Sequence, residues 1–423
     1  MTTRSTSRWN SYVRSTYLKP VLGLFSGQSV AAALPILAAP LLGRLYLPED
    51  YGALGLYMGL SSVLGTFSCL QFQEAILAEK SDRRAGQILF LCLACGCLVA
   101  ISAMVLSFGI SLFLSVHGNF QALGVWIWLL PLSVLTTALG HSVNMYCNRI
   151  GRFNYLAIMP ALITSMTVSL SILFGFWQWG ENGLFSSYFA GQGVVVTGAI
   201  WMLIRLKLDR GSIQAWFALA KRHRKFVIFT LPSRFVGEFN LQIPIYALGL
   251  TGSSAVLGLF TRARALITLP LTLAGRAVGQ VYRQKASEDY RETGSCRQAF
   301  ERTAIGLAVL AVPSMALLAW LGPDMFALFL GPNWRGAGEI VRLLAPMLFL
   351  RMIAAPLSST LLFTNSLGRE FQLSLLSGAV LILSVLLPAL LGSSPITIVT
   401  SFSAAMSVVY IVYFYASWRA SGS

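Results

Sequence analysis

Charged residues are scarce in this chain. Only 11% of its 423 residues are Asp, Glu, Lys or Arg, whereas an average soluble domain carries about 25%. The deficit runs along the whole sequence, so no segment of ordinary composition remains for a soluble domain of usual size. Hydrophobic residues make up 56% of the chain, and apolar runs recur with the length of a membrane-spanning helix. We therefore predict an all-α integral membrane protein.

The sequence also lacks the signatures of several enzyme classes. It has no Gly-rich loop followed by Lys and Ser or Thr, so direct use of ATP is not expected. Cys92, Cys95 and Cys97 share one apolar segment, but no His or carboxylate in that segment completes a metal site. We predict no catalytic residue, no metal ligand and no cofactor, and we do not expect an enzyme.

Acidic residues are outnumbered by basic ones, 15 against 31, which gives a net charge of +16. In a soluble protein this excess would suggest nucleic acid, but in a membrane protein it is typical of basic cytoplasmic loops. We therefore expect no nucleic-acid partner. If the N-terminus is cytoplasmic, 23 Lys and Arg residues lie on that side of the membrane and only Arg44 and Arg335 on the other. Both termini are predicted to face the cytoplasm.

Twelve apolar segments are long enough to cross a bilayer, at approximately 21–42, 51–72, 86–114, 123–147, 154–177, 184–206, 226–250, 254–281, 300–320, 340–363, 371–392 and 396–418. The segments form two similar halves. The run 53–57 opens the second span, and the similar run 256–260 opens the eighth span, 203 residues later. Six spans per half give the two halves the same orientation, so we predict two six-helix lobes that are parallel repeats, with a binding site between them.

The predicted lobes are residues 1–206 and 226–423, joined by a basic amphipathic linker, 207–225. The linker contains Ile213, Trp216 and Phe217 before the basic run 221–225. Two interpretations stay open: an interfacial helix that contacts anionic lipid, and a basic loop with some apolar residues.

Arginines within or at the edge of the spans are the main functional signal. An arginine near the bilayer midplane costs roughly 2.5–3.5 kcal/mol on insertion scales, and the spans contain six arginines against two carboxylates. Arginine binds phosphate oxygens and stays charged when desolvated. Arg264 lies on another helix face than Arg262 and is expected to point toward the seventh span, and Arg234 could pair with Glu238, four residues on. The candidates for binding an anionic substrate are Arg262, Arg351, Arg276, Arg264 and Arg234.

Glu238, Glu74 and His141 are the candidates for coupling transport to protons or sodium. Glu74 and Glu238 are the only acids predicted to be buried, and a buried carboxyl group can be protonated near neutral pH. Each candidate has an alternative interpretation. Glu74 could be a boundary residue at the cytoplasmic surface, and a lone histidine in a membrane is more often a packing residue than a proton relay.

Three short runs resemble a known transporter family. These are Arg44-Leu45-Tyr46-Leu47-Pro48-Glu49-Asp50-Tyr51-Gly52, Glu74-Ala75-Ile76, and the segment from Leu269-Pro270-Leu271-Thr272 to Tyr282. They are similar to the Wzx-type polysaccharide flippases of the multidrug/oligosaccharidyl-lipid/polysaccharide exporter superfamily.

The resemblance implies a twelve-span exporter fold in the bacterial inner membrane. It further implies alternating-access movement of undecaprenyl-diphosphate-linked oligosaccharide, an O-antigen or exopolysaccharide repeat unit, from the cytoplasmic to the periplasmic leaflet, with ion coupling. The expected partners are this lipid-linked substrate, membrane lipids, a polysaccharide polymerase and a chain-length regulator.

Two other functions compete with a flippase. A cation-coupled exporter of cationic drugs from the same superfamily should have a site lined by carboxylates, whereas arginines here outnumber them three to one. A membrane polysaccharide polymerase should have a sizeable periplasmic loop with catalytic residues. The longest predicted outer loop is only about 321–339.

Overall fold

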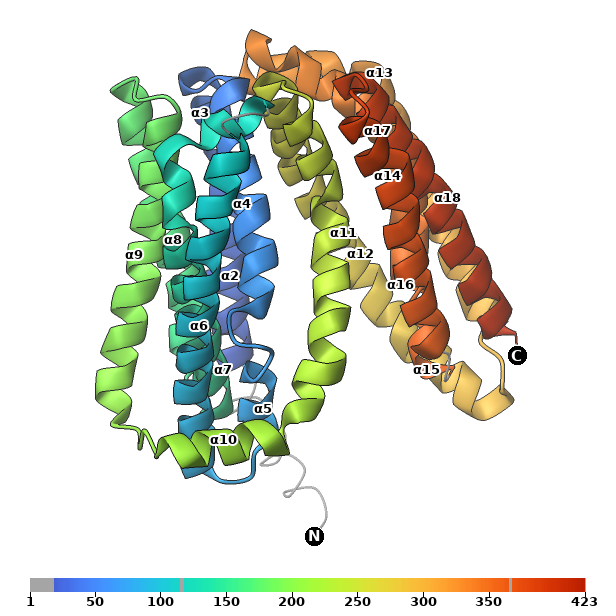
Figure 1. Cartoon of the computed structure of the whole chain (residues 1–423). Coiled ribbons are helices and arrows are strands. Elements are labelled where there is room, and N and C mark those ends of the chain that lie inside the picture. Colours follow the sequence, from blue (N-terminus) through green and yellow to red (C-terminus); the bar gives the residue numbers. More distant parts are fainter. Residues whose placement is uncertain (1–18, 115–117, 365–366, 423) are drawn as a thin grey trace. The chain divides into compact units, whose positions relative to one another are not determined.

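The computed structural model describes residues 19–114, 118–364 and 367–422. These residues form helices joined by turns, and no strand occurs in these ranges (Figure 1). A helix satisfies its own backbone hydrogen bonds, which is what a chain in lipid requires. The predicted all-α polytopic membrane fold is confirmed.

Nine helical stretches among the described residues are long and apolar enough to span a membrane. They coincide with nine of the twelve predicted spans. The stretches are Gly27–Leu45 in α2 (Lys19–Leu37) and α3 (Ala39–Leu45), Asp82–Gly109 in α6 (Asp82–Leu114), Leu123–Arg149 ending with α7 (Leu130–Arg149), α8 (Phe153–Phe176), α9 (Glu181–Leu206), α13 (Arg297–Leu330), Pro332–Leu357 ending with α14 (Arg335–Leu357), Gln372–Leu390 in α16 (Leu367–Leu381) and α17 (Leu387–Leu390), and α18 (Pro395–Ser421).

The other three predicted spans are also helices, but more polar ones. They are α4 (Pro48–Phe67), α11 (Leu231–Leu250) and α12 (Ser254–Thr293). The 40 residues of α12 extend to about 60 Å at 1.5 Å per residue, which is twice the thickness of the hydrocarbon core. Part of α12 therefore lies outside the bilayer. The arginines and Glu238 of the sequence analysis occur mainly on α11 and α12.

Contacts divide the chain into two units. Unit 1 comprises residues 1–45, 60–112 and 125–235. Its core forms around the short helix α5 (Gln73–Ala78), α6 and α7, with side chains such as Ile76, Leu89 and Val143 completely buried. The short helix α10 (Ile213–Arg222) lies against this core through the buried Leu219.

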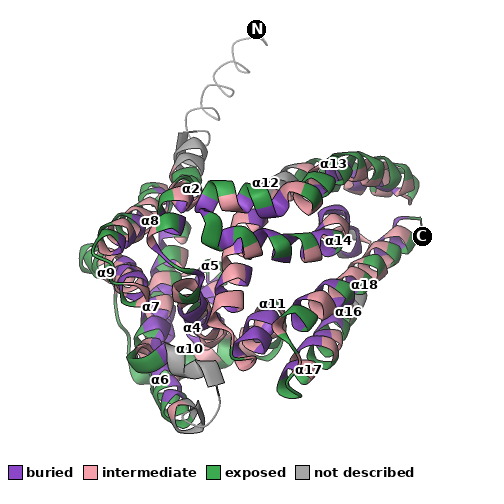
Figure 2. Cartoon of the chain, turned by 90° about the horizontal axis from the view of Figure 1, so that it is seen from above, coloured by how far each residue is buried: buried purple, intermediate pink, exposed green. Residues whose placement is uncertain are grey.

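Unit 2 comprises residues 46–59, 113–124 and 236–423. Helix α14 is its centre and packs against α12, α13 and α18. Many residues along α13 are exposed, as the colour of this helix in Figure 2 shows. They include the apolar side chains of Val309 and Leu328. Such faces suit contact with lipid rather than water. The predicted lobe boundaries at 206 and 226 stay a prediction.

Unit 2 includes the first half of α4 because that half lies directly against α12. A Cβ atom added to Gly258 of α12 would overlap the carbonyl oxygen of Pro48, and one added to Gly52 of α4 would overlap that of Ser254. Glycine at both positions lets the two backbones touch. The run 48–52 that resembles the flippase family is therefore a helix–helix junction.

Candidate functional site

Arg264 of α12 and Arg351 of α14 lie in the same polar neighbourhood of unit 2. The side chain of Arg264 points to α11, where its Nη1 donates a hydrogen bond of 2.7 Å to the carbonyl oxygen of Leu241. This confirms the expectation that Arg264 faces the seventh predicted span. Its titratable neighbours are Arg351, Glu238 of α11 and Tyr410 of α18.

This neighbourhood has an excess of positive charge. Neither Arg264 nor Arg351 takes part in any ion pair found among the described residues. The nearby carboxylate of Glu238 accepts a hydrogen bond of 2.8 Å from Nε2 of Gln242. Two arginines with one carboxylate near them, on membrane-spanning helices, leave a net charge that a bound anion would stabilise.

Arg351 also lines a cavity of about 250 Å³ between α12 and α14. The wall from α12 includes Gly275, Gly279 and Arg283, which recur every four residues and so share one face of the helix. The glycines face Pro356 of α14, with room for no more than a methyl group. Drug-sized pockets usually occupy about 300–1,000 Å³, so this cavity suits a small group such as a phosphate.

Arg262 lies elsewhere in unit 2, at the junction of α4 with α12. Its guanidinium carbon is 4.7 Å from the ring centre of Tyr51, and the ring of Tyr51 in turn contacts that of the completely buried Trp334, with 5.5 Å between centroids. Within the described part of the chain, the buried Nε and Nη2 atoms of Arg262 have no hydrogen-bond partner. This arginine is held by a cation–π contact, and it does not line the cavity of Arg351. Substrate binding by Arg262 stays a prediction.

The pair between Arg234 and Glu238, which the sequence left open, is not found among the described residues. Nη2 of Arg234 lies 3.9 Å from Oε1 of Glu74, while Glu238 is occupied by Gln242. Glu238 lies one helical turn from Arg234 and could have contacted it, but the observed partner of Arg234 is Glu74 from another helix. Both side chains of the observed pair are partly exposed, 65% for Arg234 and 31% for Glu74, so the pair itself adds little stability.

The three coupling candidates do not form one group. His141 of α7 interacts electrostatically with both Glu74 and Arg234, so these three residues form a polar cluster of unit 1. Glu238 belongs to unit 2 and accompanies Arg264 and Arg351. Arg276 was a candidate for binding the substrate, and its side chain lies outside the described residues.

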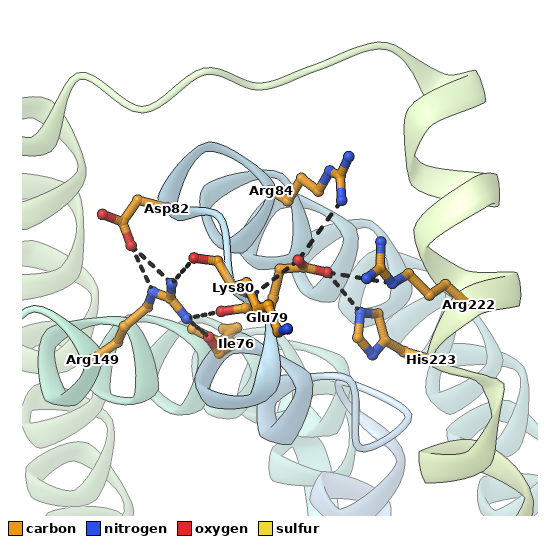
Figure 3. Close-up of polar contacts among 8 residues, drawn as sticks. All are labelled: Ile76, Glu79, Lys80, Asp82, Arg84, Arg149, Arg222 and His223. Carbon is orange, nitrogen blue, oxygen red and sulfur yellow. Dashed lines mark hydrogen bonds and ion pairs between the residues drawn. The ribbon is translucent and has the colours of Figure 1, made fainter.

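Sequence analysis missed the most deeply buried carboxylate, Glu79 (Figure 3). Its side chain is only 1% exposed and lies 3.2 Å from His223, 3.7 Å from Arg222 and 3.9 Å from Arg84. The statement that Glu74 and Glu238 are the only buried acids is therefore wrong. The signal available in the sequence was the basic run 221–225, whose positive charges can pair with a carboxylate such as Glu79.

Glu79 is an ionised anchor for α10. Burial raises the pKa of its carboxyl group, but hydrogen bonds from His223 and from the backbone of Lys80 and Ser81, together with the charge of Arg222, outweigh this and hold the pKa below its usual value. Nearby, Arg149 of α7 fixes the turn between α5 and α6 by donating to the carbonyl oxygens of Ile76 and Glu79 and to Asp82 (Figure 3).

The linker contains a helix, α10, which is one of the two interpretations that the sequence left open. Ser212 caps α10 by accepting a hydrogen bond from the backbone of Ala215. Leu219 faces the core, while Ile213 and Phe217 are 65% and 74% exposed. Contact of this exposed face with lipid stays a prediction.

Comparison with solved structures identifies the fold. The chain is similar to the lipid II flippase MurJ in an inward closed conformation, with a TM-score of 0.72 and 16% identity over 95% of this chain and 87% of that one. It is also similar to an inward-facing multidrug resistance MATE family transporter of the MOP superfamily, with a TM-score of 0.66 and 15% identity over 93% of this chain and 97% of that one. Identities this low show the fold alone, and the fold of this chain is like that of these two proteins.

Sequence comparison gives the family. No match was found among curated proteins. The profile of a family described as polysaccharide biosynthesis protein matches residues 41–339, which is well over half of the chain. This multi-pass membrane protein therefore belongs to the polysaccharide biosynthesis protein family.

Proposed function

We propose that this protein is a flippase for a lipid-linked oligosaccharide. The observation that carries the proposal is the pair Arg264 and Arg351, two cations of unit 2 without an ion-pair partner among the described residues. Arg351 lines a cavity of about 250 Å³. A diphosphate that joins a lipid to a sugar is an anion of suitable size and charge for this place. The family and the flippase fold of MurJ support the same function.

The residues suggest how the substrate would be held. Arg351 and Arg283 line the cavity from α14 and α12 and would bind phosphate oxygens. Arg264 adds positive charge from α12, fixed in orientation by its bond to Leu241. The hydrocarbon tail would stay in the bilayer, because moving an apolar chain from lipid into a polar site is unfavourable.

In its finer form the proposal is a Wzx-type flippase of the bacterial inner membrane with cytoplasmic termini. It would move undecaprenyl-diphosphate-linked repeat units to the periplasmic leaflet by alternating access, without acting as an enzyme. The three short runs given above and the basic bias of the predicted inner loops support this form. Coupling to an ion would use the polar cluster of Glu74, Arg234 and His141. A polysaccharide polymerase and a chain-length regulator are the proposed partners.

Replacing Arg351 or Arg264 with alanine tests the proposal. We expect either variant, made at normal protein level in a flippase-deficient strain, to lose most surface polysaccharide and to accumulate lipid-linked repeat units. Arg342→Ala is the matched control, because Arg342 is an exposed arginine on the same helix as Arg351 that does not line the cavity. Full complementation by both variants would contradict the proposal.

A drug exporter is the second candidate, because the MATE fold matches with a TM-score of 0.66. Cationic drugs need carboxylates, whereas arginines predominate beside the cavity in unit 2. Deletion of the gene should leave susceptibility to cationic drugs unchanged if the protein is a flippase. The length of the surface polysaccharide in a deletion strain distinguishes a flippase from a polymerase. Loss of a polymerase leaves single repeat units on the surface, and loss of a flippase leaves none.

A further inference from the structure

Unit 2 contains a second, larger hollow. It lies between the last turns of α12 and the first turns of α13, with a volume of about 1050 Å³. We call it the α12–α13 trough. Val278, Val281 and Ala299 give it an apolar wall, and Val281 is 71% exposed there. Lys285, Arg297 and Arg302 give it a basic one.

The position of the trough along α13 places it at the surface of the bilayer. Between Arg302 and Asp324 the sequence of α13 has 21 residues without charge. About 20 such residues are needed to cross the hydrocarbon core. Arg302 therefore lies at the edge of the core, at the level of the lipid headgroups. The apolar wall can face acyl chains while the basic wall faces phosphates.

The charges of the trough favour an anion. Its lining has three cations and one carboxylate, Asp289, which is 2.9 Å from Lys285. Arg297 forms an ion pair with Glu301, with 3.1 Å between Nε and Oε1, and its guanidinium group stacks on the ring of Trp418. Arg302 has no ion pair among the described residues, so its charge is free for a ligand.

The trough is separate from the cavity of Arg351. Lys285 lines the trough and Arg283 lines the cavity, and two residues along a helix correspond to a rotation of about 200°. The two hollows also have no lining residue in common. A ligand in the trough therefore faces the side of α12 opposite to the proposed substrate site.

We propose that the α12–α13 trough binds an anionic phospholipid of the bilayer as a resident lipid. Its phosphate contacts Arg302 and Arg297, and its acyl chain lies along Val278 and Val281. The hydroxyl groups of Thr293 and Ser295 in the same lining donate to backbone carbonyl oxygens, so the arginines carry the binding. The apolar and basic walls together match a lipid with both a chain and a negative charge.

Lipid titration of the purified full-length protein in detergent tests this. Native mass spectrometry counts bound dioleoylphosphatidylglycerol and, separately, dioleoylphosphatidylcholine. We expect the anionic lipid to bind more tightly, and Arg302→Gln to weaken it about fivefold, as expected for one cation at a membrane surface. Arg302→Lys should retain binding. Arg291→Gln is the matched control, because Arg291 is exposed on α12 and bonds to Ser287 outside the trough.

A second variant separates the trough from general charge effects. Val281→Trp fills the apolar wall without changing charge and should reduce binding of the anionic lipid. Equal affinity of Arg302→Gln and the unchanged protein would overturn the proposal. A second result would also overturn it: Arg302-dependent binding of undecaprenyl phosphate without binding of phosphatidylglycerol. The trough would then hold the transported lipid.

Discussion

At the scale of single residues, the environment decides what each charged group can do. Glu79 and Glu74 are five residues apart, yet Glu79 is enclosed by three basic side chains and Glu74 is partly exposed beside one. A buried carboxylate that is fully surrounded by donors is an anchor. Glu74, with one partner at 3.9 Å, is not enclosed in this way.

The lowered pKa of Glu79 predicts an acid-sensitive step in stability. A carboxyl group whose pKa is lower in the folded protein than in the unfolded chain stabilises the fold at pH values above the pKa of the unfolded chain, here 4.5. This stabilisation is lost as the pH falls through the pKa of the folded protein. We expect the melting temperature in detergent to fall below about pH 4.5. In Glu79→Gln this step should be smaller and the protein less stable near pH 7. An unchanged acid profile in that variant would contradict the anchoring role.

Glu74 carries the prediction on coupling. Protonating Glu74 would remove its attraction to Arg234 and change the field at His141. If flipping is proton-coupled, Glu74→Gln should lose the response to an imposed pH gradient in proteoliposomes. The exposed acid Glu49 gives the control, Glu49→Gln. A response that survives in Glu74→Gln would exclude this residue and leave Glu238 as the remaining carboxylate candidate.

At the scale of helices, the contact of α4 with α12 is the tightest in unit 2 that depends on glycine. Gly258→Ala would force a methyl group into the carbonyl oxygen of Pro48. Overpacking of this kind costs about 1–3 kcal/mol or more, so we expect a lower melting temperature and lower flippase activity.

The matched control is Gly306→Ala. Gly306 lies within α13 and has open space around its Cβ position. Alanine there should be neutral or stabilise the helix by up to about 1 kcal/mol. Equal stability of the two variants would show that α4 can move away from α12 at little cost, contrary to a tight junction.

The helices also show why hydropathy alone predicts some membrane spans better than others. The nine apolar spans follow from composition, because a run of about 20 apolar residues has few other uses. Helices α11 and α12 are weaker signals because they carry polar groups of the candidate sites, Glu238 and Arg264 among them. Helix α4 is weaker because it begins with Glu49 and Asp50. The pattern of twelve segments nevertheless marked all three, and the structure shows each as a helix.

At the scale of the molecule, contacts group the helices into two units, and the chain belongs to the polysaccharide biosynthesis protein family. The polar residues divide accordingly: the cluster of Glu74, Arg234 and His141 belongs to unit 1, and the arginines 264 and 351 belong to unit 2. A division of this kind suits a protein in which one part senses an ion and the other binds the substrate. The variants proposed for the two clusters therefore separate coupling from binding.

The sequence by itself determined the membrane class, the helices and the presence of unneutralised arginine, since hydropathy and charge count are properties of local composition. Only the tertiary structure decided which arginine meets which group. Arg234 has Glu74 as its partner instead of the residue one turn away, Arg262 stacks on Tyr51, and Glu79 is buried by side chains from α10 that follow it by more than 140 residues. Partners of a charge are set by distances between helices far apart in the chain, and a linear sequence contains no direct measure of those distances.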